Sequence, residues 1–147
     1  ILLGFTGISR DGTRIMQEHI KNVRTGVSES MLKEVNGISE DAYRLFKMEE
    51  DIDKIGSLLN QNWRIKRGLT KKVTNNSFDA IYDTAIKNGA LGGKLMGAGG
   101  GGFFYFLAPP QKHAKIRASL GQVNIWVPFK FATRGSILLN RSSMNEL

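Results

Sequence analysis

The sequence contains no cysteine and only two histidines, His19 and His113, which lie far apart along the chain. A chain without cysteine forms no disulfide, offers no thiolate ligand to zinc and carries no cysteine nucleophile. Two isolated histidines leave little with which to build a metal centre. Redox and zinc chemistry are therefore excluded as functions of this sequence.

Long apolar runs are absent as well. No run reaches the roughly 18 to 20 residues that a membrane-spanning helix needs. The opening residues Ile1-Leu2-Leu3 are too few, and lack the basic flank, for a signal peptide. We therefore expect a soluble protein of the cytoplasm, with no membrane partner.

The 147 residues include 21 Lys and Arg against 13 Asp and Glu, a formal net charge of +8. A chain of this length is expected to form one compact domain. It opens directly on an apolar strand, residues 1–6, without an initiator methionine. We therefore hypothesise that it is a fragment of a longer protein. The basic excess suits attraction of phosphorylated ligands.

Apolar residues recur at helical spacing in the first two thirds of the chain. Ser28 is placed to cap the second helix, and Asn36-Gly37 is a weak point within it, because glycine costs about 1 kcal/mol relative to alanine. Asn88-Gly89 is expected to end the last of these helices in a left-handed cap. The four apolar stripes cover residues 15–23, 31–46, 52 to about 67, and 78–86.

Strands are predicted mainly after residue 90. The segments 92–96 and 103–108 flank a glycine run, and the second ends at Pro109-Pro110, where a short helix is expected to begin. Further strands are predicted at 125–127, 129–131 and 137–139. Together with the first strand, these elements predict an α+β fold in which helices cover one face of a small antiparallel sheet.

The glycine run is the most informative segment, because five of the six residues 97–102 are glycine. Backbone without side chains lets N–H groups converge on an anion, or lets another chain segment approach closely. A bulged hairpin without a ligand remains an alternative. Gly97, Gly99 and Gly102 fit G-x-G-x-x-G, but an aromatic strand follows them instead of a helix, so the dinucleotide fingerprint lacks its context. A Walker loop is excluded because no Lys-Ser or Lys-Thr follows.

Residues 89–103, Gly-Ala-Leu-Gly-Gly-Lys-Leu-Met-Gly-Ala-Gly-Gly-Gly-Gly-Phe, resemble the third conserved motif of the GHMP kinases. Within that superfamily the chain is most similar to kinases of D-glycero-D-manno-heptose phosphates. The similarity extends over most of the chain, in the order expected for the family. It includes residues 5–10, Asn62-Trp63 to Lys66, the strand from Phe103 to the diproline, residues 129–131 and Gly135-Ser136.

The resemblance implies a two-domain kinase of which residues 1–147 are the ferredoxin-like C-terminal domain. The motif that wraps the ATP phosphates, the catalytic Asp and the Lys of the N-terminal half have no match here, and no catalytic or metal-binding residue is assigned to this chain. ATP and Mg²⁺ are therefore expected only in the full enzyme, and the chain alone is expected to be inactive. The residues implied near the nucleotide phosphates are Gly97, Ala98, Gly99, Gly100, Gly101 and Gly102.

The resemblance also places the end of the first strand in the substrate cleft, so Thr6, Gly7 and Arg10 are candidate contacts of a phosphorylated sugar. Lys94 either neutralises a phosphate or is the exposed alternate residue of its strand. The basic residues at the end of the third helix and just after it are expected to form a solvated face, or else to attract an anionic substrate. They are Arg64, Lys66, Arg67, Lys71 and Lys72.

Two other classes remain as alternatives: an RNA-binding module of ferredoxin-like topology and a ligand-binding domain without catalysis. The +8 charge and the aromatic strand 103–106 favour RNA binding. Against it stand the glycine run, the long helical insertion after the first strand and the continuous aromatics, which predict burial of both faces of the strand. His19, on the apolar stripe of the first helix, is expected to be a packed or hydrogen-bonded core residue, and His113 to be solvated.

Overall fold

The computed structural model describes residues 1–9, 12–48, 51–70 and 72–132. Within them, strands β1 (Leu2–Phe5), β2 (Gly92–Leu95), β3 (Phe103–Leu107) and β4 (Ile125–Trp126) form one sheet. The strand order is β2-β3-β1-β4, and each neighbouring pair is antiparallel. The sheet thus joins the start of the chain to the segments after residue 90, and the predicted α+β, ferredoxin-like fold is confirmed.

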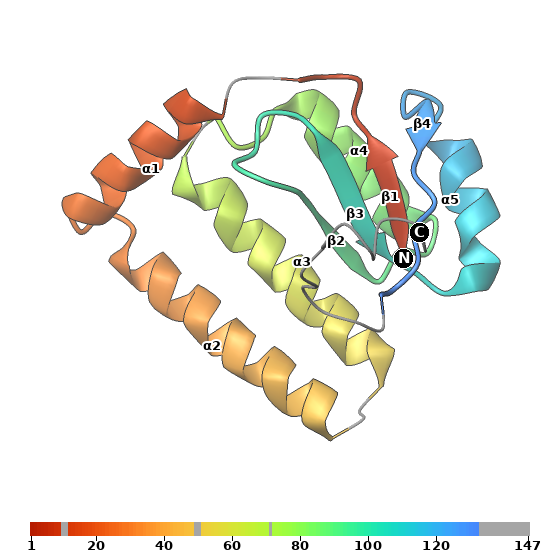
Figure 1. Cartoon of the computed structure of the whole chain (residues 1–147), viewed down its shortest axis with the longest axis horizontal. Helices are drawn as coiled ribbons and strands as arrows, with labels where there is room; N and C mark the ends of the chain where they lie inside the picture. The colour runs from red at the N-terminus through yellow and green to blue at the C-terminus, as the bar shows by residue number, and fades with distance from the viewer. Residues whose placement is uncertain (10–11, 49–50, 71, 133–147) are drawn as a thin grey trace, which may run out of the picture.

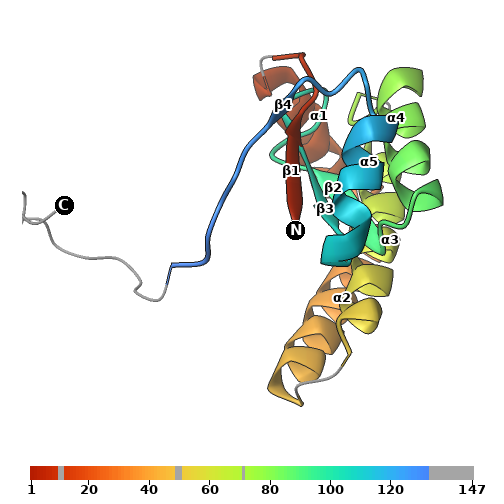
Figure 2. The same ribbon diagram turned by 90° about the vertical axis from the view of Figure 1, so that its right-hand side faces the viewer.

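The long insertion between β1 and β2 is helical: α1 (Thr13–Arg24), α2 (Glu29–Lys47), α3 (Ile52–Leu69) and α4 (Asn76–Lys87). After β3, the 3-10 turn η1 (Pro110–Lys112) leads into α5 (His113–Ser119). Figures 1 and 2 show α3, α4 and α5 on one face of the sheet, with α2 along the outer side of α3. Helices therefore cover a single face, as the sequence predicted.

The core between sheet and helices is aromatic. Trp63 on α3 and Phe78 on α4 each meet Phe104 of β3 edge-on, with ring centroids 5.9 and 6.2 Å apart. Phe104 stacks on Phe106 at 5.2 Å. These four side chains are completely buried, so their ring contacts add to the large apolar area that they remove from water.

Two glycines let α3 approach the sheet edge closely. A Cβ on Gly92 would collide with the carbonyl oxygen of Gly56 and lie 3.0 Å from its carbonyl carbon. A Cβ on Gly56 would collide in turn with the side chain of Leu91. The axis of α3 is therefore fixed against β2, which brings the C-terminal half of α3 to the loop that follows that strand.

Several local predictions are corrected or limited. Helix α2 is unbroken through Gly37, and Ser28 occupies its N-cap position without a side-chain capping bond. Residues 129–131 are not a strand, because β4 ends at Trp126, before Pro128. His113 is half-buried and its Nε2 lies 3.0 Å from the carbonyl oxygen of Ala108, so it is not a freely solvated side chain. The predictions for Arg10, Gly135-Ser136 and residues 137–139 lie outside the described residues.

The prediction that both faces of β3 are buried is wrong. Phe104 and Phe106 are buried, whereas Phe103 and Tyr105 are only half-buried and point to the opposite face. Their partners in register there are Phe5 and Leu3 of β1. Alternation of side chains along a strand produces this pattern. No helix among the described residues is long and apolar enough to cross a membrane.

Candidate functional site

The glycine run forms the connection between β2 and β3. The amide of Met96 donates to the carbonyl of Phe103 at 2.8 Å and closes the hairpin. Four of its residues, Gly97, Gly99, Gly100 and Gly102, have φ between +68° and +102°. Residues with a Cβ rarely adopt this region, so the glycines are required by the backbone path itself.

The segment after α3 holds one side of the loop. The Gly100 amide donates to the carbonyl of Val73 at 2.9 Å. A Cβ on Gly99 would lie 2.9 Å from both the Cα and the carbonyl oxygen of Val73. The loop and the buried Val73 therefore meet backbone against backbone, an approach that only glycine permits.

The end of β1 holds the other side. Both the amide and the Oγ1 of Thr6 donate to the carbonyl of Gly102 at 2.9 Å, and the Gly102 amide donates to Ile8 at 2.8 Å. A Cβ on Gly101 would lie 2.6 Å from the Ile8 carbonyl oxygen. The structure thus brings the predicted residues Thr6 and Gly7 to the loop: Thr6 is buried and supports it, while Gly7 is exposed.

Lys66 on α3 holds the entrance of the loop. Its Nζ donates to the carbonyls of Leu95 and Gly97, at 2.8 and 2.6 Å. Burial, and to a smaller extent the neighbouring Lys94, lowers the pKa of Lys66 from 10.5 to about 8. No carboxylate lies within salt-bridge distance of Lys66 among the described residues. An ammonium group here is bound by backbone dipoles alone.

The predicted solvated face of basic residues is only partly correct. Arg64 and Lys72 are exposed, but Lys66 is engaged by the loop, and Arg67 pairs with Asp79 at 3.0 Å; Lys71 lies outside the described residues. The spacing carried a signal that the sequence analysis missed. Lys66 lies three residues after the buried Trp63, so on a helix both side chains face the sheet.

Hydrogen bonding within the fold decides which loop amides remain available. The amides of Gly100 and Gly102 are used by Val73 and Ile8. Those of Ala98, Gly99 and Gly101 donate to no described residue. Successive amides in a turn of this kind can bind an anion, because each carries a partial positive charge.

Lys94 lies on β2 opposite Tyr105, on the sheet face away from the helices, and is half-buried. It is close enough to Lys66 to lower that pKa, so the loop entrance is electropositive. No group of three or more His, Asp or Glu in the described part of the chain could hold a metal ion.

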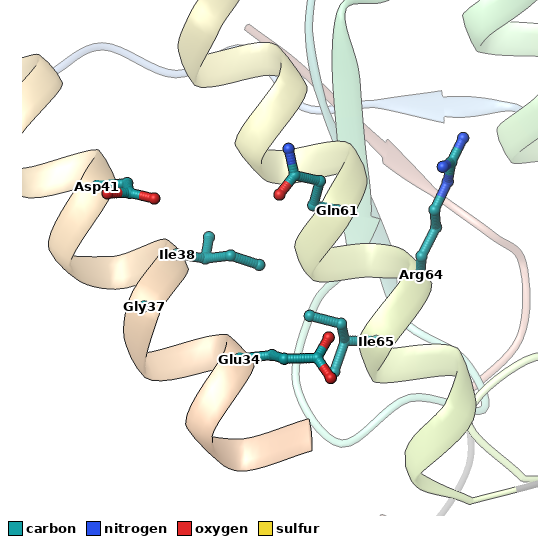
Figure 3. A pocket seen from close by; sticks show the side chains of 7 residues that line it. All are labelled: Glu34, Gly37, Ile38, Asp41, Gln61, Arg64 and Ile65. Atoms are coloured by element: carbon teal, nitrogen blue, oxygen red, sulfur yellow. The ribbon is translucent and has the colours of Figure 1, made fainter. Parts of the chain in front are cut away.

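Away from the glycine loop, a hollow of about 420 Å³ lies between α2 and α3 (Figure 3). The acids Glu34 and Asp41 on α2 point toward α3, whereas Arg64 extends away from both. The polar groups therefore do not converge on one point. The glycine loop, held from three sides, is the better candidate for a functional site.

Comparison with known proteins identifies the family of the chain. Residues 41–124 match the family model described as GHMP kinases C terminal. The chain is 34% identical over 137 residues to D-glycero-alpha-D-manno-heptose 7-phosphate kinase of Campylobacter jejuni. That match covers 91% of this chain and 40% of the relative, so the chain spans less than half the length of that protein.

Solved structures share the fold. The mevalonate kinase of L. major, solved in complex with R-mevalonate, superposes with a TM-score of 0.75 at 22% identity, over 86% of this chain and 40% of that one. The mevalonate kinase of Methanococcus jannaschii gives 0.66 at 20% identity, over 84% and 36%. The family match covers more than half of the sequence and includes α3, α4, the glycine loop and α5. The chain therefore belongs to the GHMP kinase family and matches the C-terminal domain of that family.

Proposed function

We propose that residues 1–147 are the C-terminal domain of an ATP-dependent sugar kinase that phosphorylates a heptose phosphate. The observation that carries this proposal is the glycine loop, whose path is fixed on three sides while the amides of Ala98, Gly99 and Gly101 remain available. The 34% identity to a heptose 7-phosphate kinase supports the substrate class.

The loop's role in this proposal is to present preorganised donors to nucleotide phosphate at a domain junction. Phosphoryl transfer depends on positioning and on stabilising negative charge. The hydrogen bonds between the loop and Thr6, Ile8, Val73 and Lys66 hold its backbone, so its amides can act without reorganising. Gly7, which is exposed at the end of β1, and Lys94 on β2 are proposed to contact the phosphorylated sugar, while the buried Thr6 supports the loop.

The rest of the reaction site is proposed to come from an N-terminal domain. The described residues hold no cluster of acids that fits Mg²⁺, and no residue here is assigned to catalysis. The chain spans 40% of its heptose kinase relative, which leaves room for such a domain. We expect this chain alone to be inactive, and we place the complete kinase in the cytoplasm, where ATP is available.

The direct test joins this chain to the N-terminal region encoded upstream of it. ATP-dependent phosphorylation is then measured on heptose phosphates, galactose, fucose and mevalonate. Turnover is expected on a heptose phosphate. A folded two-domain protein that phosphorylates none of the four would refute the kinase proposal, and preference for another substrate would refute only the heptose assignment.

Ala98 gives a test of the loop, because its amide is available and its side chain is half-buried. Ala98→Asp places a negative charge next to the loop amides that are proposed to bind phosphate, while Ala98→Ser is a control of similar size. Like charges about 4 Å apart cost on the order of 1 kcal/mol in water and 4 kcal/mol near a protein surface. We therefore expect kcat/KM for ATP to fall about fivefold to a thousandfold in Ala98→Asp. Equal activity of the two variants would exclude phosphate from this position.

One observation favours a second function, binding of single-stranded RNA. Phe5, Phe103 and Tyr105 gather on the sheet face away from the helices, and aromatic residues on such a face can stack bases. The Phe5 and Phe103 rings lie 5.0 Å apart and contact each other. Fluorescence anisotropy with labelled oligonucleotides decides the question: salt-dependent binding lost in Tyr105→Ala supports RNA binding, and no binding at low salt refutes it.

A further inference from the structure

A small cavity lies behind the glycine loop, on the side of α1 and α3. Its volume is about 170 Å³, and its lining includes Ile15, Met16 and His19 of α1, Leu69 at the end of α3, and Ala98 of the loop. Most of this lining is apolar. The cavity is therefore too small and too apolar for a sugar phosphate.

Two polar groups in the cavity wall have unused hydrogen-bonding capacity. His19 Nε2 is buried and has no hydrogen-bond partner within the described residues, so the predicted hydrogen-bonded core role is not seen at this atom. Lys66 also lines the cavity, and its Nζ lies 2.6 Å from the carbonyl of Gly97, another lining residue. An ammonium group has three N–H donors, and Lys66 gives two of them to Leu95 and Gly97.

The charge in this wall is unbalanced. Lys66 has no carboxylate partner among the residues that the structure describes, and its charged neighbour on β2 is another cation, Lys94. On α1, Glu18 pairs with Lys72 at 2.8 Å, and on α3 Arg67 pairs with Asp79. A half-buried ammonium beside an unpartnered imidazole nitrogen is complementary to an anion that can accept two hydrogen bonds.

We propose that this cavity binds a short-chain carboxylic acid, with its carboxylate on Lys66 and His19 and its alkyl chain against Ile15 and Leu69. The volume sets the size: a cavity of about 150 Å³ accepts a molecule such as benzene, so the acid has about four to six carbons. Because Gly97 and Ala98 form part of the wall, a bound acid contacts the back of the glycine loop. The proposal requires only this chain and is independent of the proposed kinase activity.

The test uses the 147-residue chain with butyrate as the probe. Amide and imidazole NMR shifts of Gly97, Ala98 and His19 are followed during titration, with 1-butanol as a neutral probe of similar size. Saturable shifts with a dissociation constant on the order of 1 mM are expected for butyrate. Shifts at these residues that do not saturate, or equal binding of 1-butanol, would overturn the proposal.

Three variants locate the site. Lys66→Met keeps the length of the side chain without its charge and should weaken butyrate binding at least tenfold, whereas Lys115→Met removes a charge from the exposed surface of α5 and should not. Met16→Trp narrows the cavity from a partly exposed position of α1 and should also block binding. It does so without touching the loop contacts of Lys66, so it remains decisive even if Lys66→Met fails to fold. Unchanged binding in Met16→Trp contradicts the proposed location.

Proton uptake distinguishes Lys66 from a general electrostatic effect. At pH 8 about half of the Lys66 side chains are protonated, since their pKa is about 8. A bound carboxylate favours the charged form and raises this pKa. Calorimetric titrations at pH 8 in two buffers of different ionisation enthalpy should reveal uptake of up to about half a proton per butyrate. Binding without uptake in the wild type would place the carboxylate elsewhere.

Discussion

Two glycines of the loop allow the role of close backbone packing to be separated from that of backbone conformation. Gly97 (φ +68°) and Gly99 (φ +102°) both have positive φ, but only Gly99 faces a neighbour. A Cβ on Gly97 meets nothing within 4 Å, whereas a Cβ on Gly99 would lie 2.9 Å from backbone atoms of Val73. Gly97→Ala and Gly99→Ala therefore add the same methyl group to an open and to a closed position.

The expected costs follow from these contacts. Gly97→Ala places alanine in the left-handed region, which costs about 1 kcal/mol. Gly99→Ala carries at least that cost and also forces Val73 away, which breaks the Gly100–Val73 hydrogen bond and adds about 1 kcal/mol and about 1 kcal/mol or more of overpacking strain. We therefore expect a loss of roughly 3 kcal/mol for Gly99→Ala, which corresponds to a fall in Tm of about 6 to 12 °C for a chain of this size.

Urea unfolding of the two variants and the wild type measures this difference. Amide hydrogen exchange at Gly100 checks its cause, since the amide should lose protection in Gly99→Ala and keep it in Gly97→Ala. If the two variants differ by less than about 0.5 kcal/mol, Val73 does not restrain the loop. The loop amides would then not be preorganised by this contact.

Three further substitutions test the packing and electrostatics around this site. Gly92→Ala should lower the free energy of unfolding by about 1–3 kcal/mol, because its Cβ would meet the Gly56 carbonyl. The control Gly37→Ala on α2 meets no atom within 4 Å and should raise that free energy by about 0.5–1 kcal/mol. Equal effects of the two variants in urea unfolding would show that α3 moves freely on β2. Asp79→Ala should lower the free energy of unfolding by on the order of 1.5 kcal/mol, because the Asp79 Oδ1 accepts hydrogen bonds from Arg67 and Thr74 at 3.0 and 2.9 Å. The same loss in Ser77→Ala, a change at an exposed neighbour, would assign the effect to the N-terminus of α4 instead. The pKa of Lys66 is about 8 in the folded chain and 10.5 for the free side chain, so between these pH values the unfolded chain binds more protons than the folded one. The wild type should therefore gain stability relative to Lys66→Met as the pH rises from 8 to 10.5. A constant difference in stability over that range would contradict the lowered pKa.

Much of the fold follows from local patterns in the sequence. The apolar stripes predict α1 to α4 to within a few residues, and Gly89 ends α4 with φ +107° as its cap position requires. The aromatic strand and the diproline locate β3 and the start of η1. These features depend on neighbours within about four residues, where propensity, capping and side-chain spacing act directly.

Other expectations failed where distant residues decide the outcome. The Asn36-Gly37 pair does not break α2, because α2 packs along α3, and such packing outweighs about 1 kcal/mol of helix propensity. The aromatic run of β3 suggested burial of both faces, but among the described residues the covering helices α3, α4 and α5 lie on one face of the sheet, so Tyr105 and Phe103 are half-buried. Composition alone does not reveal which face another layer will cover.

The sequence by itself determined the family, the order of the elements and the position of the glycine loop, because these are written in contiguous residues. Only the tertiary structure decided how that loop is held and which of its amides stay available. Its partners are Thr6 and Ile8, more than 90 positions before Gly102, and Lys66, which is 31 positions before Gly97. The bonds to Gly102 form once β1 has paired with β3, and those of Lys66 form once α3 has packed on β2. The packing of α3 also places Lys66 in the wall of the cavity that His19 lines.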